Sequence, residues 1–166
     1  NTGNVEELKT QLKIFNEFTN AVDRMIVGEY VDTEFEGKSI SADYLEYMHK
    51  NKTGALLKLC IRIGAILGNA SEKELEDLTL YSEKIGLAFQ IKDDILSEEG
   101  NELITGKPVG NDKEKNKCTY VTKYGLQEAK NILEKITKQA VEIVEQYGKN
   151  GEFLKQLAIY IKERNK

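Results

Sequence analysis

Two adjacent carboxylates, Asp93 and Asp94, are the side chains of this sequence best suited to chemistry. They lie in the run Gly-Leu-Ala-Phe-Gln-Ile-Lys-Asp-Asp-Ile-Leu-Ser at residues 86–97. On a helix of about 3.6 residues per turn, the polar members of this run share one arc and the apolar members lie on the other side. Two carboxylates on a half-buried helix repel each other, and a hard cation such as Mg²⁺ would hold both ionised. Spacing alone favours a cation site and a pair of solvated surface charges about equally.

The composition excludes two classes of partner. The 166 residues, 40% hydrophobic and 31% charged, suffice for one globular domain with a sizeable core. The formal net charge of −4 argues against a nucleic-acid surface, which needs a concentrated basic patch. No apolar run reaches membrane-spanning length, and no basic-then-apolar leader opens the chain. Because the two cysteines lack metal-type spacing and fit a reducing compartment, we expect a cytoplasmic protein without a membrane span.

Helical periodicity runs through most of the chain. A single proline, with apolar residues recurring three and four positions apart, predicts an all-α protein. We expect a long first helix from residue 5 to 26, a weaker pattern over 28–32 and a turn at 36–38. Later helices are expected over 125–147 and from 153 to an end within 162–166. The first helix should face the core with Leu8, Leu12, Phe15, Phe18, Val22, Met25 and Ile26. With no repeat or linker, residues 1–166 are expected to form one helical domain.

Short signals mark where the helices that carry the candidate site begin and end. Ser41 is a plausible N-cap for the second helix, which the polar and flexible segment 52–54 then interrupts. Ser71 and Glu74 form a capping box for the helix that leads into the aspartate pair. A polar loop at 98–117, containing three glycines, follows that helix, and long loops in compact domains are often functional.

Three blocks, in this order and spacing, resemble the second aspartate-rich region of the short-chain trans-prenyl diphosphate synthases. They are the run at 86–97, Gly-Lys-Pro-Val-Gly at 106–110, and Asn-Lys-Cys-Thr-Tyr at 116–120. The pattern is most similar to that of bacterial farnesyl diphosphate synthases (geranyltranstransferases). The resemblance implies an isoprenoid-synthase-type helical bundle. It runs over essentially the whole chain but corresponds only to the C-terminal part of a family member.

The resemblance assigns roles to the residues around the aspartate pair. It implies that Asp93 binds Mg²⁺ directly, with Mn²⁺ as an alternative, and that Asp94 acts through water. Gln90 would face the same metal and diphosphate, and Phe89 would line the homoallylic pocket. The last position of the family's Asp-Asp-x-x-Asp motif is Ser97 here, whose hydroxyl can still orient a water molecule.

Basic residues elsewhere match the family's diphosphate ligands. Lys52 and Thr53 resemble a Lys-Thr pair on a kinked helix, where lysine supplies a point charge to a diphosphate oxygen and threonine a hydroxyl. Lys107 and Lys117 match lysines of a loop that closes over the allylic diphosphate. Arg164, with Lys166, resembles the basic tail that covers the isopentenyl diphosphate site. For the loop lysines and for Arg164, a solvated surface position is the alternative.

Three further residues stand apart from this pattern. Glu29 replaces a glutamine of the family segment Gly-Gln-x-x-Asp, and the two side chains differ by a full charge. Asp32, in the same segment, is a weaker candidate for the same cavity. His49, the single histidine, has no partner motif and reads as a structural or surface residue.

The implied activity is prenyl transfer. Enzymes of this family join an allylic diphosphate (dimethylallyl or geranyl) to isopentenyl diphosphate, here giving farnesyl diphosphate, by a Mg²⁺-dependent carbocation mechanism. The first aspartate-rich motif, the basic N-terminal segment and the residues that set product length are absent from this sequence, so we expect the isolated chain to be inactive. A homodimer is also implied. The alternative is a non-catalytic helical subunit or binding module that keeps the fold.

Overall fold

The computed structural model describes residues 5–99 and 117–165, and all regular structure in these ranges is helical. The elements, in chain order, are α1 (Val5–Glu34), α2 (Ala42–Lys52), α3 (Gly54–Leu67), α4 (Glu72–Glu99), α7 (Tyr120–Tyr124), α8 (Leu126–Glu145), the 3₁₀ helix η1 (Gly148–Gly151) and α9 (Glu152–Glu163). The all-α prediction is therefore confirmed. Within the described ranges, no helix is both long enough and apolar enough to cross a membrane.

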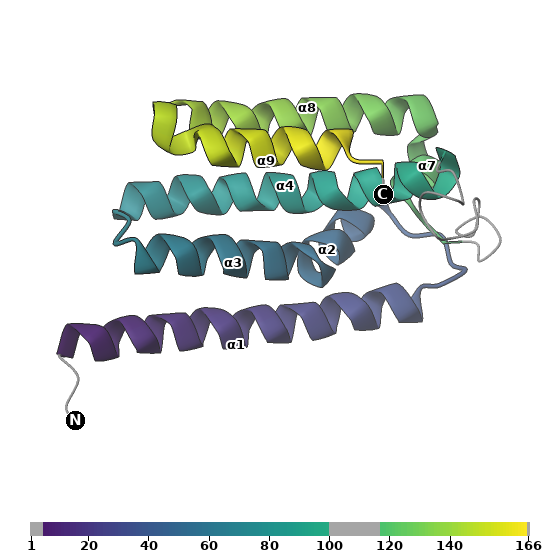
Figure 1. The fold of residues 1–166 in the computed structure, drawn as a ribbon. Helices are drawn as coiled ribbons and strands as arrows, with labels where there is room; N and C mark the ends of the chain where they lie inside the picture. Colours follow the sequence, from purple (N-terminus) through teal and green to yellow (C-terminus); the bar gives the residue numbers. More distant parts are fainter. Residues whose placement is uncertain (1–4, 100–116, 166) are drawn as a thin grey trace.

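The long helices are stacked with their axes roughly aligned, and α4 lies in the middle (Figure 1). It packs against α3 on one side and against α8 and α9 on the other. Tyr81, Ile85 and Ile91 of α4 are almost completely buried, with Leu45 of α2 and Val144 of α8. Helix α4 therefore forms the centre of the core.

Two predicted caps fix where the site-bearing helices begin. Ser41 Oγ accepts a hydrogen bond of 3.1 Å from Tyr44 N at the start of α2. Before α4, Ser71 N donates to Glu74 Oε2 at 2.7 Å and Glu74 N donates to Ser71 Oγ at 3.3 Å, a reciprocal capping box. Both predictions are confirmed.

The predicted interruption at 52–54 is also confirmed. Helix α2 ends at Lys52 and α3 begins at Gly54, with Thr53 between them. Two glycines let other helices approach this break closely. A Cβ atom on Gly28 would lie 2.2 Å from Lys52 N, and one on Gly86 would lie 3.0 Å from the Gly54 Cα atom. Backbone contact with α1 and α4 therefore holds the break in place.

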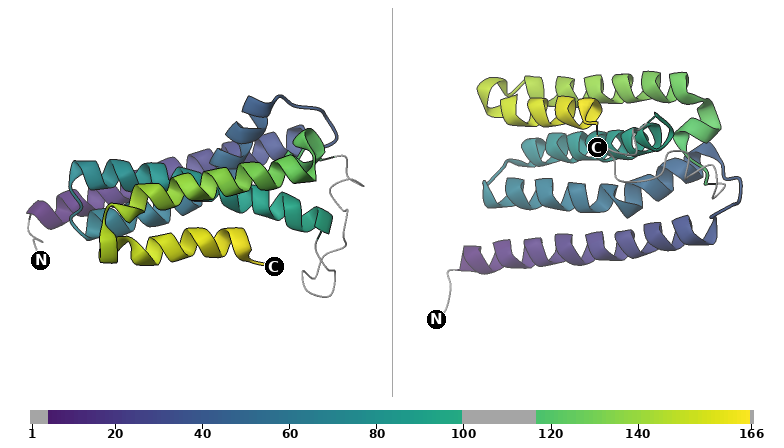
Figure 2. Two further views of the ribbon diagram at one scale, coloured as in Figure 1. Left: turned by 90° about the horizontal axis from the view of Figure 1, so that it is seen from above. Right: turned by 45° about the vertical axis from the view of Figure 1, so that its right-hand side comes forward.

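Helix α1 differs from the prediction in two ways. It continues without a break through the expected weak region and ends at Glu34, because Gly28 is packed against α2 there. Its buried residues are Ala21, Gly28 and Val31, not the large apolar stripe. Most of the stripe instead points outward: Leu8, Leu12, Phe15, Phe18 and Ile26 are exposed, whereas Val22 and Met25 are half-buried. Periodicity identifies an apolar face but not the neighbour that covers it, and α1 lies at the edge of the stack (Figure 2, right).

Candidate functional site

The described candidate residues gather at one end of the bundle. In Figure 1 the end of α1, helix α2, the end of α4, α7 and the C-terminus lie together there. Helix α3 runs back along α4, so α2 lies beside the second half of α4. Lys107 falls in 100–116, outside the described residues, and its position stays a prediction.

Asp94 is the anchored member of the carboxylate pair. Its Oδ2 atom accepts a 2.8 Å hydrogen bond from Tyr120 N and lies 3.7 Å from Nε2 of His49. The two side chains are only 10% and 6% exposed. His49 in turn stacks on Tyr120, with the ring centroids 5.8 Å apart. Residues of α2, α4 and α7 therefore surround this carboxylate.

Asp93, its neighbour, is exposed. Its carboxylate forms an ion pair with Arg164, near the end of the chain. The Arg164 guanidinium donates to Asp93 Oδ1, donates to the Phe89 carbonyl oxygen at 3.1 Å, and lies 4.1 Å from the centroid of the Phe89 ring. The side chain of Arg164 is only 9% exposed. Of the two interpretations of Arg164, the solvated chain end is therefore wrong for this structure.

Lys52 lies in a second group of charges at the end of α1. Its Nζ atom is 2.5 Å from Asp32 Oδ2 and 3.0 Å from Glu29 Oε2, while Nζ of Lys117 is 4.0 Å from Asp32. Burial lowers the pKa of Lys52, but the hydrogen bonds and charges of Asp32 and Glu29 outweigh burial and leave the pKa above its ordinary value. Lys52 is therefore a firmly charged ammonium group, and a diphosphate would compete with two carboxylates for it.

Two contacts show how the helix break faces the aspartate-bearing part of α4. On one side of Lys52, His49 reaches Asp94. On the other side, Gly54 touches Gly86, two turns before Asp93. The segment from His49 to Gly54 therefore runs alongside residues 86–94 of α4, where Phe89 and Gln90 are half-buried. This register brings the predicted Lys52–Thr53 pair and the aspartate pair to the same end of the fold.

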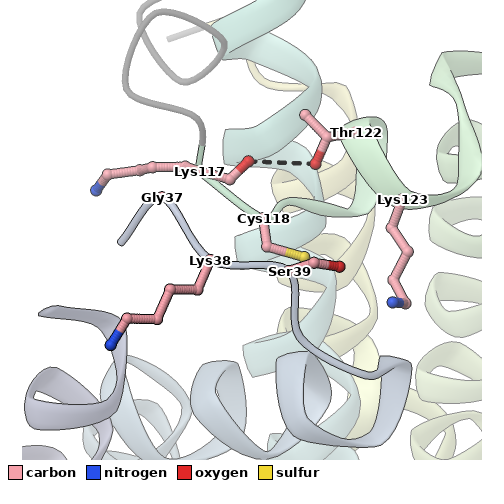
Figure 3. A pocket seen from close by; sticks show the side chains of 7 residues that line it. All are labelled: Gly37, Lys38, Ser39, Lys117, Cys118, Thr122 and Lys123. Atoms are coloured by element: carbon pink, nitrogen blue, oxygen red, sulfur yellow. Dashed lines mark hydrogen bonds between the residues drawn. The ribbon is translucent and has the colours of Figure 1, made fainter. Parts of the chain in front are cut away.

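A pocket of about 330 Å³ opens beside Lys117 (Figure 3). Its lining residues are Gly37, Lys38, Ser39, Lys117, Cys118, Thr122 and Lys123. Each lysine already has a partner: Lys38 contacts Glu34 at 3.0 Å, Lys117 lies near Asp32, and Lys123 donates to the Ile40 carbonyl at 2.6 Å. Lys117 is therefore the residue that links this pocket to the Lys52 group.

The aspartate pair alone does not make a protein-only metal cage. Over residues 5–99 and 117–165, no group of three or more His, Cys, Asp or Glu side chains is placed to hold a metal ion. Mg²⁺, however, is commonly held by one or two carboxylates together with substrate phosphates and water. Exposed Asp93 and anchored Asp94 are hard oxygen donors, so they fit a cation shared with a bound diphosphate.

Comparison with known proteins identifies the family. Residues 3–153 match the sequence profile described as "Polyprenyl synthetase". The chain belongs to this family. A farnesyl diphosphate synthase from Bacillus subtilis (strain 168) is 38% identical to it over 136 residues, covering 81% of this chain and 46% of that protein. One from Micrococcus luteus is 34% identical over 160 residues, covering 96% and 55%.

A solved structure matches the fold of this chain. The geranylgeranyl pyrophosphate synthetase from Pyrococcus horikoshii Ot3 gives a TM-score of 0.84 at 26% identity, covering 94% of this chain and 60% of that one. The chain thus spans about half the length of the curated relatives it matches.

Two residues matter more than the sequence indicated. Asp32, a weak candidate, accepts a hydrogen bond from Lys52 and forms a longer ion pair with Lys117. His49, expected to be structural or on the surface, is buried against Asp94. A sequence signal for His49 does exist, since it lies one turn before Lys52 on the same helix.

Proposed function

We propose that this chain binds the diphosphate group of a prenyl substrate together with Mg²⁺. In this role it provides part of the active site of a prenyltransferase that joins an allylic diphosphate to isopentenyl diphosphate, with farnesyl diphosphate as the product. The observation that carries the proposal is that the helix break at Lys52 lies alongside the part of α4 that carries Asp93 and Asp94, at one end of the bundle. Membership of the family supplies the substrate class.

Asp93 and Asp94 have different roles in binding the cation. Asp93, which is exposed, is the direct ligand of the cation, and binding requires it to exchange Arg164 for the metal. Asp94, whose Oδ2 accepts a hydrogen bond from Tyr120 N, contacts the cation indirectly, through a water molecule. When bound, Mg²⁺ neutralises charge that develops on the departing diphosphate. Gln90, one turn before Asp93, faces the same ligand.

The basic residues complete the diphosphate site. Lys52 supplies a fixed positive charge at the helix break, and Thr53 adds a hydroxyl beside it. Lys117 and, from outside the described residues, Lys107 add charge from the loop side. Released from Asp93, Arg164 covers the isopentenyl diphosphate site, while Phe89, on which it stacks, lines the pocket for the apolar substrate.

The 166-residue chain provides one half of such a site. It forms a single helical domain that corresponds to the C-terminal part of its relatives, and its sequence contains no second Asp-Asp-x-x-Asp-like cluster. Prenyl transfer therefore depends on carboxylates that these 166 residues do not supply. Farnesyl diphosphate is the product we propose, and a geranylgeranyl product is the alternative, because both kinds of synthase resemble the chain.

Thermal unfolding with inorganic pyrophosphate tests this function. We expect pyrophosphate with Mg²⁺ to raise the melting temperature of the purified chain, and EDTA to remove the effect, because a ligand that binds only the folded state stabilises it. Asp93→Asn should abolish most of the shift, whereas Asp43→Asn, an exposed acid in the first turn of α2, should leave it unchanged. An equal shift with EDTA, or in Asp93→Asn, would contradict the proposal.

A non-catalytic helical module is the second candidate. Two ion pairs favour it, because each engages a residue of the diphosphate site with another side chain. Arg164 pairs with Asp93, and Glu29 is a second carboxylate paired with Lys52. Such a module has no need of a diphosphate site, so it predicts no Mg²⁺-dependent shift. A prenyl-transfer assay with geranyl diphosphate, labelled isopentenyl diphosphate and Mg²⁺ tests whether the chain holds a complete catalytic site or half of one. Product formed by the isolated chain would show that the site is complete and would overturn the half-site interpretation.

A further inference from the structure

The His49 side chain is buried without a hydrogen-bond partner. His49 is only 5% exposed, and within the described part of the chain neither of its ring nitrogens has a hydrogen-bond partner. A buried polar group left unpaired costs about 1–3 kcal/mol of folding free energy. A phenylalanine would fill the same space and stack on Tyr120 without this cost. The imidazole is therefore better explained by a polar partner that a small movement of the side chains brings within hydrogen-bond distance.

The geometry offers one such partner in the described residues. His49 Nε2 lies 3.7 Å from Asp94 Oδ2, the same oxygen that accepts the hydrogen bond from Tyr120 N. This distance exceeds a hydrogen bond by roughly 0.5 Å, so a small movement of either side chain would form one. The stack on Tyr120 keeps the ring beside that oxygen.

We propose that His49 is a positioning residue for Asp94. Its imidazole carries a proton on Nε2, and together with Tyr120 N–H it holds Oδ2 on the protein side of the site. Held in this way, the Asp94 carboxylate keeps one orientation toward the metal-bound diphosphate. This inference rests on the proposed function for its ligand, but the pairing of His49 with Asp94 can be tested without any ligand.

Nitrogen NMR reads the pairing directly, because His49 is the only histidine in the chain. In a two-bond ¹H–¹⁵N spectrum of the ¹⁵N-labelled protein, a protonated and a bare ring nitrogen resonate far apart. We expect Nε2 to carry the proton and its signal to move in Asp94→Asn. A bare Nε2, or a spectrum unchanged by Asp94→Asn, would overturn the proposal. The spectrum tests the pairing even if the chain binds no pyrophosphate, in which case only the proposed function fails.

Matched variants then test the consequence for binding. His49→Phe keeps the ring but removes the donor, and it should weaken Mg²⁺-dependent pyrophosphate binding about tenfold, as is usual for residues that support metal ligands. His49→Gln, whose amide can donate from a similar place, should restore most of the affinity and keeps the test valid if His49→Phe fails to fold.

The control removes another buried, unpartnered polar group. Thr137 of α8 is 3% exposed, and its Oγ1 atom lacks a hydrogen-bond partner in the described residues. Thr137→Val should leave pyrophosphate affinity unchanged and the fold as stable or more stable. If His49→Phe behaves in the same way, with unchanged affinity, His49 is only a core residue and the proposal is wrong.

Discussion

Glu29 is the residue at which this chain departs most clearly in charge from the pattern it resembles. Its carboxylate lies 3.0 Å from the Lys52 ammonium, which Asp32 already contacts at 2.5 Å. Both carboxylates stabilise the charged form of Lys52, but they also compete with any anion that approaches it. At the residue scale, the affinity of the site therefore depends on how strongly Lys52 is held by α1.

Removing the Glu29 charge should strengthen diphosphate binding. Because an exposed ion pair is worth at most about 1 kcal/mol, Glu29→Gln should raise the affinity for Mg²⁺-pyrophosphate by up to about fivefold in a calorimetric titration. Glu34→Gln, which removes an exposed carboxylate paired with Lys38, is the matched control and should change little. Weaker binding by Glu29→Gln would show that the acid helps the ligand instead.

At the scale of elements, two kinds of contact hold the site-bearing helices in register. One is the close approach of backbones at Gly28 and Lys52, and the other is a polar bridge across three helices. Arg62 of α3 donates to Glu17 of α1 at 2.8 and 2.5 Å and to Thr79 of α4 at 2.5 Å. Because α1 has few large buried residues, these contacts carry much of its attachment.

A side chain at residue 28 should separate α1 from α2. Gly28→Ala would place a Cβ atom 2.2 Å from Lys52 N, and such overpacking against backbone should lower the free energy of unfolding by about 3 kcal/mol. Gly64→Ala, in α3, is the control: its Cβ would meet nothing within 4 Å, and it should stabilise the helix by about 0.5–1 kcal/mol. Urea denaturation measures both. An equally stable Gly28→Ala would refute the packing argument.

The Glu17–Arg62 bridge should make stability depend on pH. Hydrogen bonding from Arg62 lowers the pKa of Glu17 below its ordinary 4.5, so the stabilisation is full above that pH and disappears as pH falls through the lowered pKa. Arg62→Met should cost about 1–2 kcal/mol at pH 7. The difference from the unmodified protein should shrink below pH 4.5. A difference that stays constant down to pH 2.5 would contradict this assignment.

At the scale of the whole molecule, α1 leaves a large apolar face uncovered. Phe15 is 66% and Leu12 61% exposed, on a helix at the edge of the stack. Apolar faces of this extent usually mark interaction surfaces. A second copy of the chain, in the homodimer implied by the family resemblance, would cover it.

The isolated chain should therefore self-associate. We expect light scattering to show dimers or larger species at micromolar concentrations, and Phe15→Glu to shift them toward monomer by placing a charge on the apolar face. Asn16→Glu, at an exposed polar position of the same helix, is the control for added charge and should change little. A chain that is monomeric at every concentration would contradict the prediction.

Local signals and long-range contacts differ in how far the sequence could predict them. The caps at Ser41 and Ser71 and the break at Thr53 depend on residues within a few positions of one another, and all three were predicted. The outward direction of the apolar face of α1 was not predicted, since it depends on which helices pack beside α1. The Arg164–Asp93 pair needs α8 and α9 to bring the chain back along α4, and no spacing in the sequence shows that.

The central claim is that Asp93 and Lys52, on different helices, face one Mg²⁺-bound diphosphate. A double-mutant cycle tests it most directly: pyrophosphate is titrated calorimetrically with Mg²⁺ into the unmodified chain, Asp93→Asn, Lys52→Gln and the double variant. We predict that each single change weakens binding and that the two are coupled by at least about 0.5 kcal/mol. Purely additive losses, or binding that is unaffected by either change, would show that the two residues do not share a ligand.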